Sequence, residues 1–184
     1  MYKAIKFIST TLFIVATRAY DVYATYQHTP DLKNEANPLV SVLGMSWLPL
    51  LFVIGALLAY IIYANYQATF SNFSLFPPQK GYSFGEFVAY LYLGKKTSWT
   101  ACFYQLPKSF KRFTNYMGNV MTHSLIIAGT VSTIMWYLIR NTVFYKTYHN
   151  PVLIYSLIII GMGLWLYYWL QNNYQQYIQQ HEIQ

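Results

Sequence analysis

The sequence predicts an all-α membrane protein: a four-span helical bundle with an amphipathic surface helix on the cytoplasmic side. Of its 184 residues, 55% are hydrophobic and only 9% are charged, whereas a soluble domain contains roughly a quarter charged residues. The apolar residues also gather into stretches of about 20, the length that crosses a bilayer. These observations exclude a disordered chain, a coiled coil and nearly every soluble globular fold.

Four stretches are long and apolar enough to be spans of one integral membrane domain covering residues 1–184. The first is the poorest, because only eleven residues separate Lys6 from Arg18. A basic start and an apolar run are also typical of a signal peptide, but threonines interrupt the run, and we expect a retained span. The last three contain no Lys, Arg, Asp or Glu. The predicted spans are residues 4–26, 47–66, 116–139 and 151–170.

The distribution of basic residues predicts the orientation of the bundle. Eight Lys and Arg lie in the N-terminal tail and the segment 67–115, whereas three lie in the 27–46 and 140–150 loops. Cytoplasmic segments carry the excess of basic residues. We therefore expect a multi-pass protein of the cell membrane, with both termini in the cytoplasm and the two loops outside.

The net charge of +7 has a simple explanation in such a protein. Basic inner segments meet anionic lipid, and the chain lacks a basic soluble module of the kind that binds nucleic acid. We therefore expect the lipid bilayer as a partner, with anionic lipid at the basic inner segment, and no nucleic acid.

The inner segment at about residues 82–113 contains a predicted helix that is too short to cross a bilayer. Ser83 and Glu86 have the spacing of a capping box, and Gly94 is typical of a helix end. We expect this helix to lie on the inner leaflet surface.

Phe87 and Leu91 fall on one face of this short helix, and we expect that face to point into the lipid. A second basic and aromatic patch follows at residues 108–113. The whole surface could instead be a docking site for a cytosolic partner.

Three of the five carboxylates lie within fifteen residues, near the outer end of the first span. On a helix, Arg18, Asp21 and Thr25 share a face, at steps of three and four residues. An ion in a membrane is costly unless it is paired or reaches water. One interpretation is a structural Arg18–Asp21 ion pair that makes the span tolerable. The other is that Asp21 faces a polar cavity as a ligand or proton-carrying group.

The loop after the first span contains two apparent helix starts, Thr29–Pro30 and Asn37–Pro38, each with proline in the first turn. Glu35 and Asn37 would then lie at a break between two short helical pieces. Glu35 could simply satisfy the free N–H groups of a helix start. It could instead join Asp21 and Asn37 in an oxygen-rich site for a divalent cation or a headgroup amine.

The pattern Asp21-x-x-x-Thr25, followed by Glu35-x-Asn37-Pro38, resembles an uncharacterised family of small prokaryotic polytopic membrane proteins. Members of that family have an Asp and a Thr late in the first helix and a Glu-x-Asn-Pro motif that opens the next segment. The match covers residues 15–45. The resemblance implies candidate positions for a site, without an assigned activity.

The third span carries a polar stripe, because Asn115, Asn119 and His123 follow one another at steps of four. A histidine in a span usually faces the bundle interior, for an interhelical hydrogen bond or for a ligand or proton relay. His123 should lie about 10 Å deep from the cytoplasmic side, whereas Asp21 and Glu35 lie near the opposite side. We therefore expect no shared metal site.

The sequence favours a protein that binds or conducts a small ion, a lipid headgroup or a membrane partner through an outer polar site. The alternative is an intramembrane enzyme that acts on a lipid-linked substrate, with a carboxylate as acid or base. No HExxH, CxxC, GxSxG, P-loop or GxGxxG motif occurs, which favours the first class. Small residues spaced by four in the spans could pack within one chain or between chains, so the partners could include a second copy or a membrane partner protein. The candidate ligand-binding residues are Asp21, Thr25, Glu35, Asn37, Asn119 and His123.

Overall fold

The structure, a computed structural model, describes residues 1–33 and 35–182. Within these residues, helices are the only regular secondary structure. Four helices have 24 to 32 residues, and four shorter ones lie in the connections. In chain order the elements are α1 (Tyr2–His28), α2 (Pro38–Ser41), α3 (Trp47–Phe70), α4 (Phe84–Leu93), the 3-10 helix η1 (Trp99–Phe103), α5 (Phe110–Asn141), α6 (Val143–Tyr148) and α7 (Pro151–Glu182).

Three of the described helices, α3, α5 and α7, are long and apolar enough to cross a membrane. The helix α1 is of similar length but less apolar, because four charged side chains lie within it: Lys3, Lys6, Arg18 and Asp21. The coarse prediction of an all-helical membrane protein is thus supported, while the count of four spans stays a prediction.

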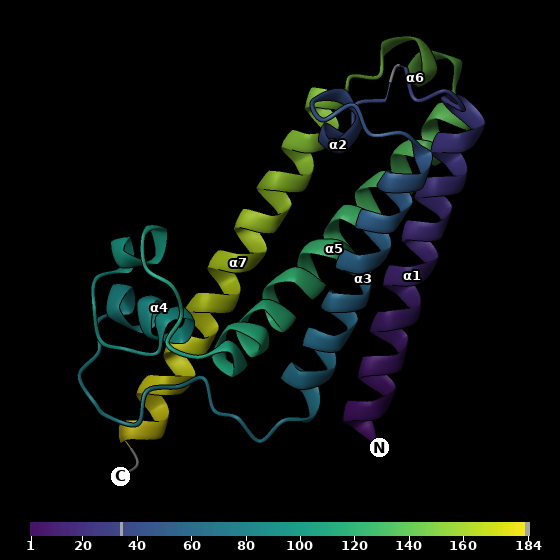
Figure 1. Ribbon diagram of the computed structural model, residues 1–184. Coiled ribbons are helices and arrows are strands. Elements are labelled where there is room, and N and C mark those ends of the chain that lie inside the picture. Colours follow the sequence, from purple (N-terminus) through teal and green to yellow (C-terminus); the bar gives the residue numbers. More distant parts are fainter. Residues whose placement is uncertain (34, 183–184) are drawn as a thin grey trace.

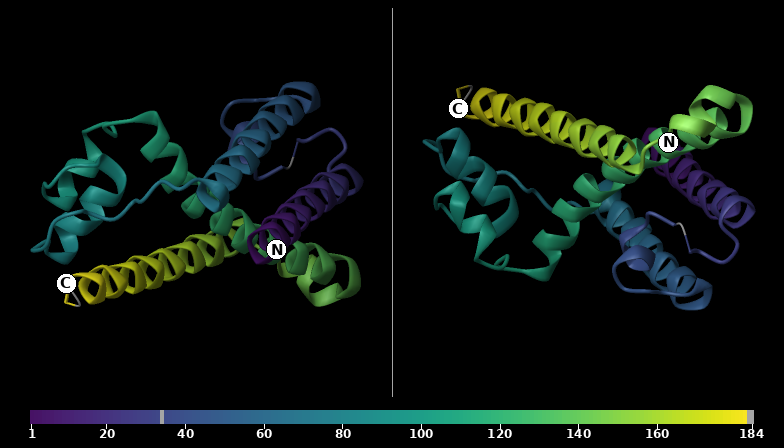
Figure 2. Two further views of the ribbon diagram at one scale, coloured as in Figure 1. Left: turned by 90° about the horizontal axis from the view of Figure 1, so that it is seen from below. Right: turned by 90° about the horizontal axis from the view of Figure 1, so that it is seen from above.

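The long helices are arranged around α5, which contacts α1, α3 and α7. Figure 1 shows α1, α3 and α5 side by side, with α7 diverging toward the C-terminus. The views along the bundle show the same divergence from a common centre (Figure 2). Both termini lie at one end, and α2 and α6 lie at the other (Figure 1).

Two glycines on α5 allow the closest helix contacts. A Cβ added at Gly118 would overlap the backbone carbonyl of Ala64 on α3, and a Cβ at Gly129 would overlap the side chain of Thr17 on α1. Both positions place a bare helix backbone against its neighbour, as small residues do in membrane bundles.

The predicted capping box of α4 is confirmed. The Ser83 N–H donates to the Glu86 carboxylate at 2.9 Å, and the Glu86 N–H donates to the Ser83 hydroxyl at 3.4 Å. Gly94 ends the helix with φ of +80°, a left-handed conformation that glycine adopts without strain.

The expected contact of the α4 apolar face with lipid is wrong for two of its residues. Phe87 is 0% exposed and Leu91 is 1% exposed, because the last turns of α7 cover them. The helix α7 continues to Glu182, well past the predicted span end at residue 170. Its Tyr177 is 2% exposed and donates a hydrogen bond to the Gln79 carbonyl at 2.8 Å. Aromatic residues beyond the span thus dock α7 onto α4.

Arg112, expected in the exposed basic patch at 108–113, is instead buried at 8% exposure. Its guanidinium donates to the carbonyls of Leu75 and Tyr90, both at 3.0 Å. It also lies over the rings of Phe73 and Tyr90, 5.2 and 4.7 Å from their centroids. Arg112 therefore joins the loop after α3, the end of α4 and the start of α5.

Candidate functional site

The site lies at the end of the bundle that contains α2 and α6, where α1 passes into the 29–46 loop. The expected helix start at Thr29–Pro30 is wrong, because Thr29 ends α1 and its hydroxyl donates to the Thr25 carbonyl at 3.1 Å. Leu32 then turns the chain with φ of +58°. The second predicted start is confirmed: Asn37 caps α2 and accepts from the Leu39 N–H at 3.0 Å.

Asp21 is fixed by two donors from different elements. Arg18, one turn earlier on α1, lies 3.3 Å from one carboxylate oxygen. The indole N–H of Trp136 on α5 donates to the other oxygen at 2.8 Å. Arg18 also donates to the Ser132 hydroxyl on α5 at 3.0 Å. The ion pair therefore also links α1 to α5.

Glu35 is held by neutral donors alone. The Thr29 hydroxyl donates to one carboxylate oxygen at 3.3 Å, and the Asn37 backbone N–H donates to the other at 3.1 Å. Within the described residues, Asp21, Asp31 and Glu86 each have a cationic partner, whereas Glu35 has none. Glu35 therefore has no cationic side chain within ion-pair distance among the described residues.

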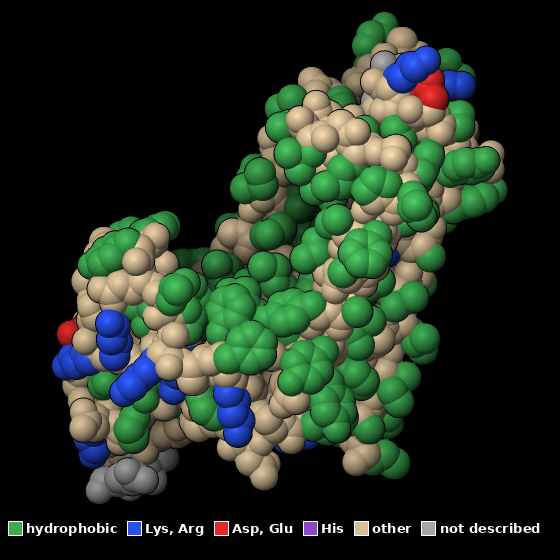
Figure 3. Space-filling model, in the orientation of Figure 1, with side chains coloured by type: hydrophobic (Ala, Val, Ile, Leu, Met, Phe, Trp, Pro, Cys, Tyr) green, Lys and Arg blue, Asp and Glu red, His purple; other side chains and the backbone are tan. Residues whose placement is uncertain are grey.

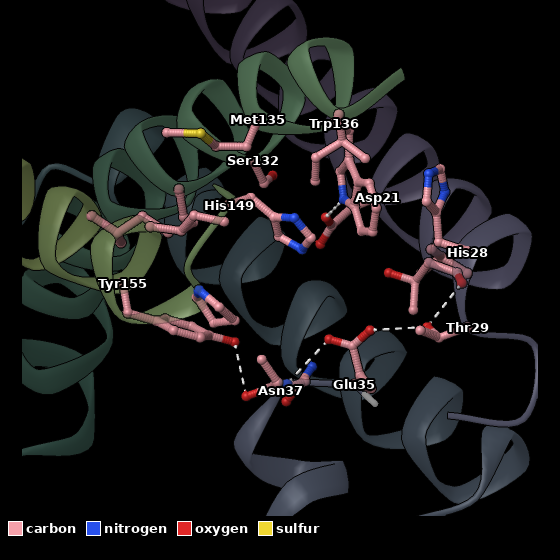
Figure 4. Close-up of a pocket in the computed structure, with 18 of the residues that line it drawn as sticks. Asp21, His28, Thr29, Glu35, Asn37, Ser132, Met135, Trp136, His149 and Tyr155 are labelled. Carbon is pink, nitrogen blue, oxygen red and sulfur yellow. Dashed lines mark hydrogen bonds between the residues drawn. The ribbon is translucent and has the colours of Figure 1, made fainter. Parts of the chain in front are cut away.

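These side chains line a pocket of about 590 Å³, formed by α1, α3, α5, α6, α7 and the 29–46 loop. Figure 4 shows Asp21, Glu35 and His149 pointing into it from three directions. Its polar lining includes Arg18, Asp21, Thr25, His28, Thr29, Glu35, Asn37, Ser132, Lys146, His149 and Tyr155. Its apolar lining includes Leu50, Ile54, Ala128, Ile139, Ile154 and Ile158. The pocket thus has a polar part and an apolar part.

The structure brings four of the six candidate residues together in this pocket: Asp21, Thr25, Glu35 and Asn37. It does not bring Asn119 and His123 there. The His123 ring stacks on Trp165 with centroids 4.4 Å apart, and its Nδ1 lies 2.8 Å from the Asn119 carbonyl. The Asn119 side chain donates to the Asn115 carbonyl at 3.0 Å, so Asn119 and His123 have partners on α5 and α7 outside the pocket.

Sequence reasoning missed several lining residues. His28, Lys146 and His149 lie in the segments 27–46 and 140–150, which the charge count placed on the same side as Glu35. This predicted common side was the available signal. It does not show that the two segments come together in one pocket. Trp136 on α5 carried no signal, because an aromatic near a span end is usually an interfacial anchor.

In the described part of the chain, no group of three or more His, Cys, Asp or Glu side chains is arranged to hold a metal ion.

Comparison with known proteins adds no identification. No protein-family model, no curated protein and no solved structure matches the chain.

Proposed function

We propose that this chain is a multi-pass membrane protein that binds the zwitterionic headgroup of a membrane lipid in the pocket. The three apolar helices support the membrane setting. So does the surface in Figure 3, where Lys and Arg gather toward the two ends and hydrophobic side chains cover the part between. In this proposal the pocket is on the outer side, both termini are cytoplasmic, and α1 is a fourth span.

The membrane position of α1 has support from its surface. Ile5, Ile8 and Leu12 are each more than half exposed along one stretch of the helix. Arg18 and Asp21 pair with each other at 3.3 Å, which lowers the cost of keeping them near the end of a span.

The observation that carries the proposal is that Glu35 lacks an ion-pair partner within the described residues and lies at a pocket with an apolar wall. A carboxylate without a cationic partner favours a bound ammonium group. Lys146 lines the same pocket, is exposed and has no ion-pair partner within the described residues, so it suits the adjoining phosphate. Apolar residues of α3, α5 and α7, such as Leu50, Ala128 and Ile154, suit the acyl chains.

A thermal-shift experiment tests this proposal. Delipidated protein in detergent is heated with phospholipids that share acyl chains but carry ethanolamine, choline or glycerol headgroups. A lipid at about 100 times its Kd adds about 2.7 kcal/mol, on the order of 5–10 °C in Tm. We expect the amine headgroups to raise Tm in the wild type and in Asp31→Asn, but not in Glu35→Gln.

Equal shifts with all headgroups, or an undiminished shift in Glu35→Gln, would contradict the proposal. Asp31→Asn is the matched control, because Asp31 lies in the same loop and its ion pair with Lys33, at 3.3 Å, is exposed to solvent.

One observation favours the alternative of an intramembrane enzyme on a lipid-linked substrate. His149 and His28 line the pocket with the two carboxylates, and histidine is the commonest general acid or base. Incubation with the lipid that stabilises the protein best, followed by mass analysis of the lipid, separates the two functions. A binding protein leaves the lipid unchanged. An enzyme converts it into a product, and His149→Ala should abolish formation of that product.

A further inference from the structure

An exposed apolar segment follows α4, and the lipid pocket does not explain it. We name residues 99–106 the aromatic loop; it comprises η1 and the residues after it. Three of its side chains are strongly exposed: Phe103 at 80%, Tyr104 at 73% and Leu106 at 87%. Trp99 is 53% exposed, and Phe110 just beyond is 69% exposed. Clustered exposure of large apolar side chains marks an interaction surface.

The backbone of the aromatic loop is fixed to α4, so this exposure belongs to an ordered surface. Ala101 is 0% exposed and packs with Ala89 and Leu93 of α4. The Lys108 N–H donates to the Leu93 carbonyl at 2.9 Å, just after the loop. With one side packed on α4, the larger side chains are directed outward.

Basic side chains flank the aromatic loop on both sides. Lys95 and Lys96 precede it, Lys108 and Lys111 follow it, and all four are exposed. Within the described residues, one of them has an acidic partner: Lys96 lies 3.8 Å from Glu86. Hydrophobic side chains gather at the upper end of the α4 region in Figure 3, and Lys and Arg gather lower on it.

We propose that the aromatic loop inserts into the bilayer interface, at the end of the bundle where both termini lie, with the flanking lysines at anionic phosphates. The loop leads directly into α5, a helix able to cross the membrane, so it lies beside the bilayer that α5 enters. Trp and Tyr prefer this depth because their rings are apolar and their tips are polar. The lipid-contacting element of the α4 region is therefore this loop, because α7 covers the main apolar face of α4.

The positive charge of the flanking lysines, and the connection of the aromatic loop to α5, favour lipid over another protein as the partner of this surface. A bilayer with anionic headgroups matches apolar side chains rimmed by lysines. The inference does not depend on the pocket ligand, so it can fail or hold separately from the proposed function.

Site-directed spin labelling of the full chain in nanodiscs of mixed phosphatidylcholine and phosphatidylglycerol tests the insertion. Cys102 is the single native cysteine, so Cys102→Ala provides a background for Phe103→Cys. The matched control is Gln79→Cys, an exposed position whose backbone accepts from Tyr177 near the end of α7. Collisions of each label with oxygen, which enters lipid, and with a water-soluble nickel chelate are compared.

We expect the label at 103 to collide often with oxygen and rarely with the nickel chelate. The label at 79 should collide often with the nickel chelate and less often with oxygen. Leu106→Cys should repeat the result at a second exposed position. A label at 103 that the nickel chelate reaches as easily as at 79 would overturn the insertion. So would a label shielded from both reagents, which indicates coverage by protein.

Discussion

Arg18 and Asp21 are the two charged residues in an otherwise uncharged part of α1, and they form an ion pair at 3.3 Å. Asp21→Asn would leave the Arg18 guanidinium, whose side chain is 19% exposed, without its counter-charge. We expect a loss of about 1–3 kcal/mol in the free energy of unfolding, measured by chemical denaturation in detergent micelles.

The double variant Arg18→Gln with Asp21→Asn should recover part of that loss, because it removes the unpaired charge. Asp31→Asn is the control, since its pair with Lys33 is exposed and contributes little. A double variant less stable than Asp21→Asn alone would show that the pair is not the stabilising feature.

Residue-level reasoning predicted part of the pocket. Asp21 and Thr25 share a helix face, and Glu35 follows within one short loop, so local geometry brought them together. Lys146 and His149 reach the same pocket from more than a hundred residues away. Their approach depends on how α6 and α7 pack on α1, which no local pattern in a single sequence encodes.

At the scale of elements, the α3–α5 contact depends on Gly118. A methyl group there would overlap the Ala64 carbonyl, and a backbone atom cannot rotate away. We expect Gly118→Ala to cost about 3 kcal/mol, the upper part of the range for overpacking, in the same denaturation assay. Gly55→Ala on α3 is the matched control, because nothing lies within 4 Å of the added methyl. Equal stability of the two variants would refute the close contact.

The capping box gives α4 a pH dependence. Hydrogen bonds from the Ser83 N–H and hydroxyl lower the pKa of Glu86 below its ordinary value of 4.5. The folded helix therefore gains stability above pH 4.5, and this gain disappears as the pH falls through the lowered pKa. Hydrogen-exchange protection of α4 amides, corrected for intrinsic rates, should fall in that window.

Glu86→Gln is the comparison for this pH dependence, because it cannot titrate. We expect its α4 protection to stay level across the same pH range, and α5 amides to show no change in either protein. A wild-type α4 that loses no more protection than Glu86→Gln as the pH falls from 4.5 through the lowered pKa would argue against the capping carboxylate as the cause.

The sequence predicted where the helices lie more readily than it predicted what packs against them. Hydrophobic length and periodicity predicted the long helices and α4. The same periodicity describes a face that meets lipid and a face that meets protein, so the cover of Phe87 by α7 could not be read from it. Tyr177 and Tyr174 beyond the predicted span were the signal that α7 continues as a packed helix.

At the scale of the whole molecule, charge and apolar surface are separated along the bundle. The pocket lies at the end of the bundle that contains α2 and α6. Both termini and the α4 region lie toward the opposite end (Figure 1). This arrangement is consistent with both proposals, because the proposed headgroup site and the proposed interfacial loop are separated by helices long and apolar enough to cross a bilayer.

Native mass spectrometry of protein released from lipid nanodiscs tests the central proposal most directly. We predict that the wild type and Asp31→Asn each retain one phospholipid with an amine headgroup, and that Glu35→Gln loses it while remaining folded. A wild type that releases without lipid, or a Glu35→Gln variant that retains the same lipid to the same extent, would contradict a headgroup site at Glu35.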